Sequence, residues 1–325
     1  SYAGSSSFFL LKDTITRLTG FEYVIPTHQG RAAENVLFSH LVHNGDIVPG
    51  NSHFDTTKGH IESRKAVALD CTVDEAKDTQ LEVPFKGNVD PAKLETALKQ
   101  YKDKIPFIIV TVTNNTAGGQ PVSMQNLREV RALADKYGKR VIFDSARFVE
   151  NAYFIKTRED GYADKTIKEI VKEMFSLADG MTMSSKKDGL VNMGGFIATR
   201  HEDWYEGAKK FCIPFEGYLT YGGMNGRDMA ALAVGLEENT EFDNIETRIK
   251  QVQYLAARLD EYGIPYQRPV GGHALFVDAD KVLSSVPKEE FPAQTLAIEL
   301  YLEAGIRGCE IGYILADRDP VTREN

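Results

Sequence analysis

The 325-residue sequence has few cysteines, a deficit of positive charge and no long hydrophobic run. The three cysteines, Cys71, Cys212 and Cys309, are scattered and odd in number, which favours a reducing cytoplasm over a disulfide-stabilised secreted protein. No apolar stretch approaches the length of a membrane-spanning helix. With 38 basic and 47 acidic residues the net charge is −9, whereas a nucleic-acid-binding surface needs a basic stripe. We therefore expect a soluble cytoplasmic protein that binds neither membranes nor nucleic acids.

Several common site signatures are also absent. The first residues, Ser1–Ser5, lack the basic and apolar regions of a secretory signal. No glycine pattern has the spacing of a dinucleotide-binding or triphosphate-binding loop. His53, Asp55 and His60 lie close together in the sequence, but their spacing is too loose to predict a metal site. The sequence thus predicts neither a nucleotide cofactor nor metal-based catalysis.

Residues 64–200 alternate between short apolar segments and amphipathic segments, which predicts an α/β protein with a mostly parallel sheet. Successive predicted strands end in polar residues, and open α/β sheets bind ligands at the carboxyl ends of their strands. The strands are predicted at residues 23–25, 66–69, 81–84, 107–112, 141–143, 181–183, 194–198 and 306–310, and the helices at 8–19, 32–41, 91–101, 123–137, 167–177, 226–237, 245–262 and 293–304.

A break in the apolar pattern near residue 240 predicts two domains. Residues 1–240 form the larger, cofactor-binding domain, and residues 241–325 form part of a smaller α/β domain. The sequence has no initiator Met and stops in a turn-like stretch, so we expect the large domain to lack its N-terminal part and the small domain to lack its C-terminal part.

Two strand-end residues suggest a pyridoxal phosphate site. Asp144 follows the apolar run 141–143, and Lys187 follows a second short strand some forty residues later. A carboxylate keeps the pyridine nitrogen of this cofactor protonated, so that the ring can accept electrons, and a lysine binds the aldehyde as a Schiff base. Adjacent lysines such as Lys186 and Lys187 also occur in ordinary solvated loops, so this pair does not decide the matter alone.

The segment Pro26–Arg31 opens the predicted helix 32–41 and is a candidate phosphate site. Backbone donors at a helix N-terminus and the charge of Arg31 favour an anion, and Gly30 allows it to approach the backbone. An ordinary capped loop explains these residues equally well. In the same way, Phe54 could stack on a planar cofactor or pack in the core.

Short motifs spread over nearly the whole chain point to one family. They are Ile25–Arg31, Thr116–Ser123, Asp144–Ile155, Ser184–Asp188, Tyr221–Gly223, Val270–His273 and Phe291–Gln294. Together they resemble the β-eliminating lyases of aromatic amino acids, the family of tryptophanase and tyrosine phenol-lyase. The resemblance implies the aspartate aminotransferase-like fold, called fold type I, and a homotetramer built as a dimer of dimers.

The resemblance also implies roles for individual residues. Lys187 would be the Schiff-base lysine and Asp144 the partner of the pyridinium nitrogen. Tyr2 would lie near the leaving group, across a subunit interface, and Asn192 would bind a monovalent cation such as potassium through its backbone carbonyl. The other cofactor contacts would be Gln29, Gly30, Arg31, Ser184 and Lys186 at the phosphate, Phe54 on the ring face, and Asn115 and Arg147 at the ring 3-oxygen.

Two positions favour L-tryptophan as the substrate, with indole, pyruvate and ammonia as products. Asp55 stands where tyrosine phenol-lyase has threonine, and Ile311 stands where it has arginine. An apolar wall with one carboxylate suits indole, which has a single N–H donor. Tyrosine phenol-lyase, cysteine desulfhydrase and aminotransferase activities remain alternatives.

The family's N-terminal segment, its C-terminal arginine for the substrate carboxylate and a histidine near the leaving group have no counterpart in the sequence. Because a bidentate carboxylate anchor orients the substrate, its loss would impair turnover. A chain that binds pyridoxal phosphate without catalysis, as a fragment or a non-catalytic subunit, is therefore a second hypothesis.

Overall fold

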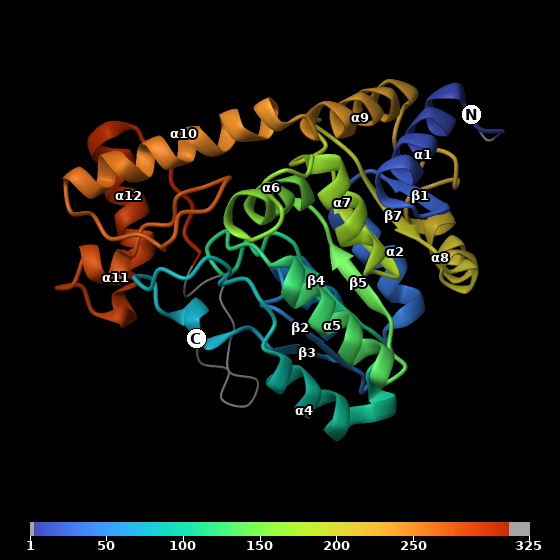
Figure 1. Cartoon of the computed structure of the whole chain (residues 1–325), viewed down its shortest axis with the longest axis horizontal. Coiled ribbons are helices and arrows are strands. Elements are labelled where there is room, and N and C mark those ends of the chain that lie inside the picture. Colours follow the sequence, from blue (N-terminus) through green and yellow to red (C-terminus); the bar gives the residue numbers. More distant parts are fainter. Residues whose placement is uncertain (1–2, 312–325) are drawn as a thin grey trace.

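A computed structural model describes residues 3–311 and contains one seven-stranded sheet (Figure 1). The strand order is β1-β7-β6-β5-β4-β2-β3, and β7 alone runs antiparallel to its neighbours. This confirms the predicted α/β class with a large, mostly parallel sheet. The strands are β1 (Tyr23–Thr27), β2 (Ile47–Gly50), β3 (Val67–Asp70), β4 (Ile108–Thr111), β5 (Val141–Asp144), β6 (Gly180–Ser184) and β7 (Gly195–Thr199).

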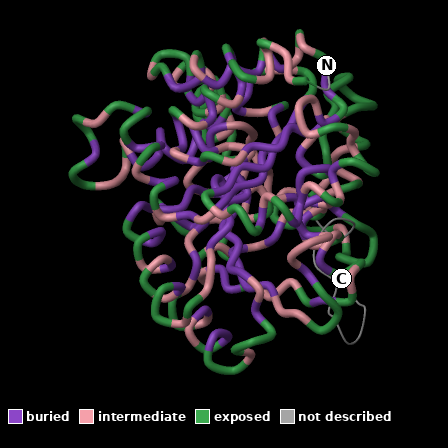
Figure 2. Tube along the Cα trace, turned by 90° about the vertical axis from the view of Figure 1, so that its right-hand side faces the viewer, coloured by how far each residue is buried: buried purple, intermediate pink, exposed green. Residues whose placement is uncertain are grey.

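Helices cover both faces of the sheet, and each face has its own apolar core. In β5, Ile142 belongs to one core and Phe143 to the other, because successive side chains of a strand point to opposite faces. Buried residues accordingly concentrate at the centre of the molecule (Figure 2). The helices are α1 (Ser6–Thr19), α2 (Gly30–Leu41), α3 (Asp55–Glu62), α4 (Pro91–Tyr101), α5 (Met124–Lys136), α6 (Phe148–Arg158), α7 (Ile167–Ser176), α8 (Glu202–Phe215), α9 (Gly226–Asn239), α10 (Phe242–Glu261), α11 (Ala279–Val282) and α12 (Pro292–Ala304).

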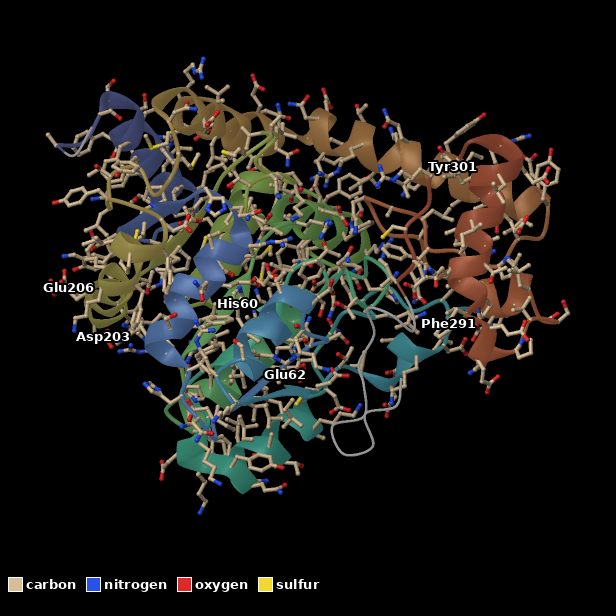
Figure 3. The ribbon with its side chains drawn as sticks, turned by 180° about the vertical axis from the view of Figure 1, so that it is seen from behind. His60, Glu62, Asp203, Glu206, Phe291 and Tyr301 are labelled. Atoms are coloured by element: carbon tan, nitrogen blue, oxygen red, sulfur yellow. The ribbon has the colours of Figure 1, made fainter. Side chains whose placement is uncertain are left out.

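Residues 242–311 extend away from the sheet (Figure 1). α10 runs from the end of α9 toward the side of the molecule that carries α11 and α12 (Figure 1). Seen from behind, Glu206 of α8 lies at the opposite end of the molecule from Tyr301 of α12 (Figure 3). The expected boundary near residue 240 falls between α9 and α10, and the division into two domains stays a prediction. Within residues 3–311, no helix has the length and apolar character needed to cross a membrane.

Two predicted strands are wrong. Residues 81–84 have an irregular backbone rather than a strand, since the buried ammonium group of Lys86 takes the backbone carbonyls of Asp78, Leu81 and Arg268 as hydrogen-bond acceptors. Residues 306–310 have an exposed, irregular backbone instead of a strand.

Among the strands and α-helices, five were not predicted, namely β2, α3, α6, α8 and α11. α6 is buried from Phe148 to Ile155, so it lacks the polar face by which an amphipathic helix is recognised. The strand β2 contains Pro49, a residue that argues against a strand in the middle of a sheet.

The core beneath the site gives the first testable prediction. Phe175 is fully buried, and its ring lies 5.5–6.0 Å from those of Phe21, Phe143 and Phe148. Phe175→Ala should lower the free energy of unfolding by about 3–5 kcal/mol, because it removes apolar contacts and leaves a cavity. Phe215→Ala, at a side chain that is 54% exposed, should change it by no more than about 0.5 kcal/mol. Denaturant unfolding measures both, and equal losses would contradict this assignment of the core.

Candidate active site

A cleft lies at the carboxyl ends of the central strands. Every residue predicted to contact the cofactor lines it, together with residues that the sequence did not single out. The predicted lining residues are Gln29, Gly30, Arg31, Phe54, Asn115, Asp144, Arg147, Ser184, Lys186 and Lys187, and the additional ones are Glu34, Thr56, Thr111, Thr113, Ala146, Thr182 and Met183.

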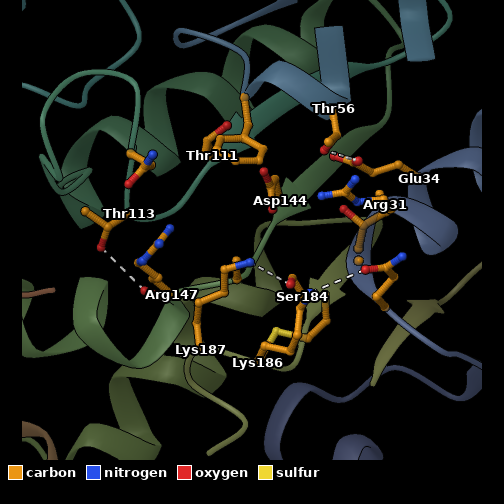
Figure 4. Close-up of a pocket in the computed structure, with 17 residues that line it drawn as sticks. Arg31, Glu34, Thr56, Thr111, Thr113, Asp144, Arg147, Ser184, Lys186 and Lys187 are labelled. Carbon is orange, nitrogen blue, oxygen red and sulfur yellow. Dashed lines mark hydrogen bonds between the residues drawn. The ribbon is translucent and has the colours of Figure 1, made fainter. Parts of the chain in front are cut away.

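The register of the central strands places the residues at the centre of this cleft next to one another. Asp144 of β5 pairs with Thr111 of β4 on one side and with Thr182 of β6 on the other. Since the three strands are parallel, their carboxyl ends meet at one edge of the sheet. Asp144, Arg147 and Lys187 therefore face a common space, although they come from separate parts of the chain (Figure 4).

The N-terminus of α2 forms one end of the cleft. Gln29 is the N-cap residue, but its side chain makes no capping hydrogen bond and instead accepts one from Lys186 Nζ, with an O–N distance of 3.3 Å. A Cβ atom at Gly30 would lie 2.5 Å from Ser184 Cβ, so only glycine permits this close approach of α2 to β6. Backbone donors, a hydroxyl and the cations Arg31 and Lys186 thus gather where a phosphate group would fit.

Lys187 lies inside the cleft, where its amine donates a hydrogen bond to the hydroxyl of Ser184, with an Nζ–Oγ distance of 2.7 Å. Burial lowers the pKa of Lys187, the positive charge of Arg147 lowers it further, and the negative charge of Asp144 opposes the shift. A lysine must be neutral to attack an aldehyde, so this environment favours Schiff-base chemistry.

Asp144 and Glu34 are two buried carboxyl groups on neighbouring walls. Burial raises the pKa of Asp144, while Lys187, the Ala146 backbone N–H and Arg147 act in the opposite direction. Burial and the charge of Asp144 raise the pKa of Glu34 to about 8. Glu34 also accepts a hydrogen bond from Thr56, with an O–O distance of 2.6 Å. A neutral Glu34 adds no second negative charge beside Asp144, which would favour pairing of the Asp144 carboxylate with a pyridinium N–H.

Sequence reasoning missed Glu34, although a signal was present. Glu34 lies on the buried side of α2 with Leu37 and Phe38, where a charged residue is unexpected unless it serves the site. The apolar pattern of helix 32–41 could therefore have identified it.

The described residues fit pyridoxal phosphate. Among them, the buried Arg147 Nε and Thr182 Oγ1 atoms have no hydrogen-bond partner, although both residues line the cleft. Buried polar atoms normally find partners. Arg147 Nε would suit the anionic 3-oxygen of the ring, and Asp144 would suit its nitrogen.

Of the four other predicted site residues, three are described, and none of those three lines this cleft. Asp55 is the first residue of α3, directly after Phe54, and its side chain is exposed. Asn192 is exposed in the loop between β6 and β7, and Ile311 is 37% exposed at the end of the described chain. Tyr2 lies outside the described residues. Their roles stay predictions.

A model of the β-eliminating lyase family matches residues 1–325 of the chain. The chain belongs to the β-eliminating lyase family. A probable β-eliminating lyase of Trichomonas vaginalis is 80% identical over all of this chain and 71% of its own length. A tyrosine phenol-lyase of Pasteurella multocida is 52% identical over all of the chain and 71% of its own length, and a tryptophanase of Salinibacter ruber is 49% identical over 98% and 68%, respectively.

The fold agrees with this assignment. A serine palmitoyltransferase of Sphingomonas wittichii matches with a TM-score of 0.58 and 15% identity over 83% of this chain and 60% of its own. At this identity the likeness concerns the fold alone. The protein is thus a lyase of the pyridoxal phosphate type that acts on an amino acid, and its similarity to both named activities leaves the amino acid open.

The close approach at Gly30 can be tested by substitution. Gly30→Ala should weaken binding of pyridoxal phosphate to the lyase apoprotein by at least about tenfold, equivalent to about 1.4 kcal/mol, because the new Cβ would push α2 away from Ser184. Gly59→Ala is the matched control, since a Cβ there meets nothing within 4 Å. Absorbance titration measures both affinities, and unchanged binding by the Gly30 variant would argue against a phosphate site at α2.

The lowered pKa of Lys187 predicts a pH dependence. Covalent capture of pyridoxal phosphate needs the neutral amine, so capture should reach its plateau below the pH at which an ordinary lysine, with a pKa of about 10.4, loses its proton. Arg147→Met removes a cation that lowers this pKa and should move the midpoint to higher pH. Lys172→Met, on the exposed side of α7, should leave it unchanged. Stopped-flow absorbance across pH gives the midpoints, and identical values for wild type and the Arg147 variant would contradict the prediction.

Proposed function

We propose that this β-eliminating lyase releases indole from L-tryptophan, with pyruvate and ammonia as the other products. The observation that carries the reaction class is the placement of Lys187, Asp144 and Arg147 around one buried cleft. The choice of tryptophan is supported by Asp55 next to the cleft residue Phe54, and by Ile311 in place of an arginine.

Pyridoxal phosphate, when bound, supplies an electron sink for the negative charge that develops at the substrate α-carbon. The amine of Lys187 takes the α-proton, and its lowered pKa favours the neutral form needed for this step. Asp144 keeps a proton on the ring nitrogen. Asn115 and Arg147 hold the ring 3-oxygen, and Phe54 stacks on the ring.

The phosphate group is held at the N-terminus of α2. Gln29, Gly30 and Arg31 supply one side of this cradle, and Ser184 and Lys186 supply the other. Anchoring at this end fixes the register of the ring against Lys187, which reduces the entropy cost of reaching the reactive geometry.

The leaving group requires a second proton transfer. Tyr2 protonates the indole carbon, and the carboxylate of Asp55 accepts the indole N–H. The bond between the β-carbon and indole then breaks, its electron pair leaves with the protonated indole, and addition of water yields pyruvate and ammonia.

Three further assignments complete the proposal. The backbone carbonyl of Asn192, five residues after Lys187 in the sequence, binds potassium or another monovalent cation. The chain assembles as a homotetramer, in which Tyr2 serves a neighbouring subunit. The protein works in the cytoplasm, in line with its three cysteines being free.

A tyrosine phenol-lyase or a cysteine desulfhydrase is the second candidate, since relatives with the former name match as well as tryptophanases do. Adding L-tryptophan, L-tyrosine and L-cysteine to one preparation with potassium, and measuring indole, phenol and sulfide, separates the three activities. Indole should form fastest. Faster release of phenol or sulfide would show that tyrosine or cysteine, rather than tryptophan, is the substrate. A yellow protein that releases none of the three products would indicate a non-catalytic subunit.

Lys187→Ala should abolish turnover and remove the long-wavelength absorbance of the lysine-bound cofactor, because it removes the amine that binds the aldehyde and takes the α-proton. Lys172→Ala keeps the fold and the cleft unchanged, and should retain both properties. The two variants are compared by absorbance and product release. Turnover and absorbance that survive in the Lys187 variant would end the assignment.

A further inference from the structure

A chain of hydrogen bonds runs from α10 through the protein interior to the cleft. Arg248 Nη2 donates to Glu150 Oε2 over 3.0 Å, and Glu150 Oε1 lies 2.8 Å from His273 Nδ1. His273 Nε2 in turn lies 2.8 Å from Asn115 Oδ1. The side chain of Glu150 is fully buried and that of His273 is 12% exposed. His273 does not line the cleft, whereas Asn115 does.

Two acceptor atoms face the nitrogens of the His273 ring, Glu150 Oε1 at Nδ1 and Asn115 Oδ1 at Nε2. Burial opposes ionisation of Glu150, but the charges and hydrogen bonds of His273 and Arg248, together with the charge of Arg147, outweigh it and lower the pKa of Glu150. Arg248 also donates to Asp188 over 2.8 Å, so one guanidinium binds two buried carboxyl groups.

The contacts of the His273 ring fix the amide of Asn115. An ionised Glu150 can only accept, so Nδ1 donates to it, and Nε2 faces Asn115 Oδ1, which can also only accept. The acceptor is then Asn115 Oδ1, which leaves the Nδ2 donor for the cleft. An amide without this bond could present either its oxygen or its nitrogen there.

Close packing prevents His273 from leaving this position. A Cβ at Gly272 would lie 2.8 Å from Glu150 Cδ, and a Cβ at Gly119 would lie 3.1 Å from His273 Cε1. Gly272 N also donates to Glu150 Oε1 over 3.3 Å. Glycines on both sides thus let the backbone close around the imidazole ring.

We propose that His273 is a positioning residue that turns the amide N–H of Asn115 toward the 3-oxygen of pyridoxal phosphate. The inference rests on the proposed function in one respect, namely that Asn115 contacts this oxygen. Arg248 and Glu150 hold His273 from behind, and the same guanidinium also binds Asp188, the residue next to Lys187. The C-terminal part of the chain therefore acts on the site without touching the cofactor.

Two isosteric substitutions separate the bonds of His273. The amide nitrogen of glutamine reaches the place of Nε2 and can donate to Asn115, whereas that of asparagine reaches only the place of Nδ1 and faces Glu150. His273→Asn should weaken pyridoxal phosphate binding by about tenfold and move the absorbance maximum of the bound cofactor in the same direction as Asn115→Ala. His273→Gln should stay within about threefold of wild type. Phe276→Leu, which alters only the ring packed edge-on against His273, should behave as wild type.

The double variant decides whether His273 acts through Asn115. In the Asn115→Ala background, His273→Asn should cause no further loss, because its effect passes through the missing amide. Additive losses would overturn the proposal, as would wild-type affinity and absorbance in His273→Asn. Thermal unfolding of the apoproteins identifies a variant that is merely destabilised.

If His273→Asn does not fold, the unaltered protein still gives an answer. Solid-state NMR of apoprotein labelled with ¹⁵N-histidine, with His273 identified by the glutamine variant, should show a protonated and hydrogen-bonded Nε2. An Nε2 without a proton would overturn the proposal. Wild-type protein that neither binds pyridoxal phosphate nor releases indole would instead count against the proposed function, and the NMR result is independent of that outcome.

Discussion

The electrostatic balance between Asp144 and Lys187 in a buried cleft is the constraint on which the site depends. Each group disfavours its own charge because water is excluded, and each favours the charge of the other. The cleft therefore suits a ligand that brings a positive ring nitrogen to Asp144 and an aldehyde to Lys187. Helix α2 and the ends of β4, β5 and β6 form the walls that shield Asp144 and Lys187 from solvent.

Local sequence predicted the parts of the fold that have a local cause. Buried parallel strands read as short apolar runs, and polar residues at their ends predicted the edge of the sheet that carries the cleft. The interior helix α6 has no polar face to reveal it, and residues 81–84 look like a strand although Lys86 binds the carbonyl of Leu81 together with that of the distant Arg268. The link between Asn115 and His273 likewise joins residues far apart in the chain, so no spacing rule could predict it.

Many residues of the chain identify its family, whereas only a few positions bear on its substrate. The machinery for removing an α-proton and stabilising the resulting charge involves many side chains, and these are common to every activity in the family. The leaving group is proposed to be distinguished by a few positions, such as Asp55 and Ile311. Comparable identity to a tyrosine phenol-lyase and a tryptophanase, 52% and 49%, is therefore expected of either activity.

The buried ammonium group of Lys86 takes on a task that secreted proteins give to a disulfide or a calcium ion. It binds the backbone carbonyls of Asp78, Leu81 and Arg268, and so joins the segment that contains Asp78 and Leu81 to the loop that leads to His273. An organic cation of this kind is insensitive to redox state and to chelators. In a protein with few cysteines, the loop behind the cleft is thus held in place by a lysine side chain, which needs neither an oxidising compartment nor a metal ion.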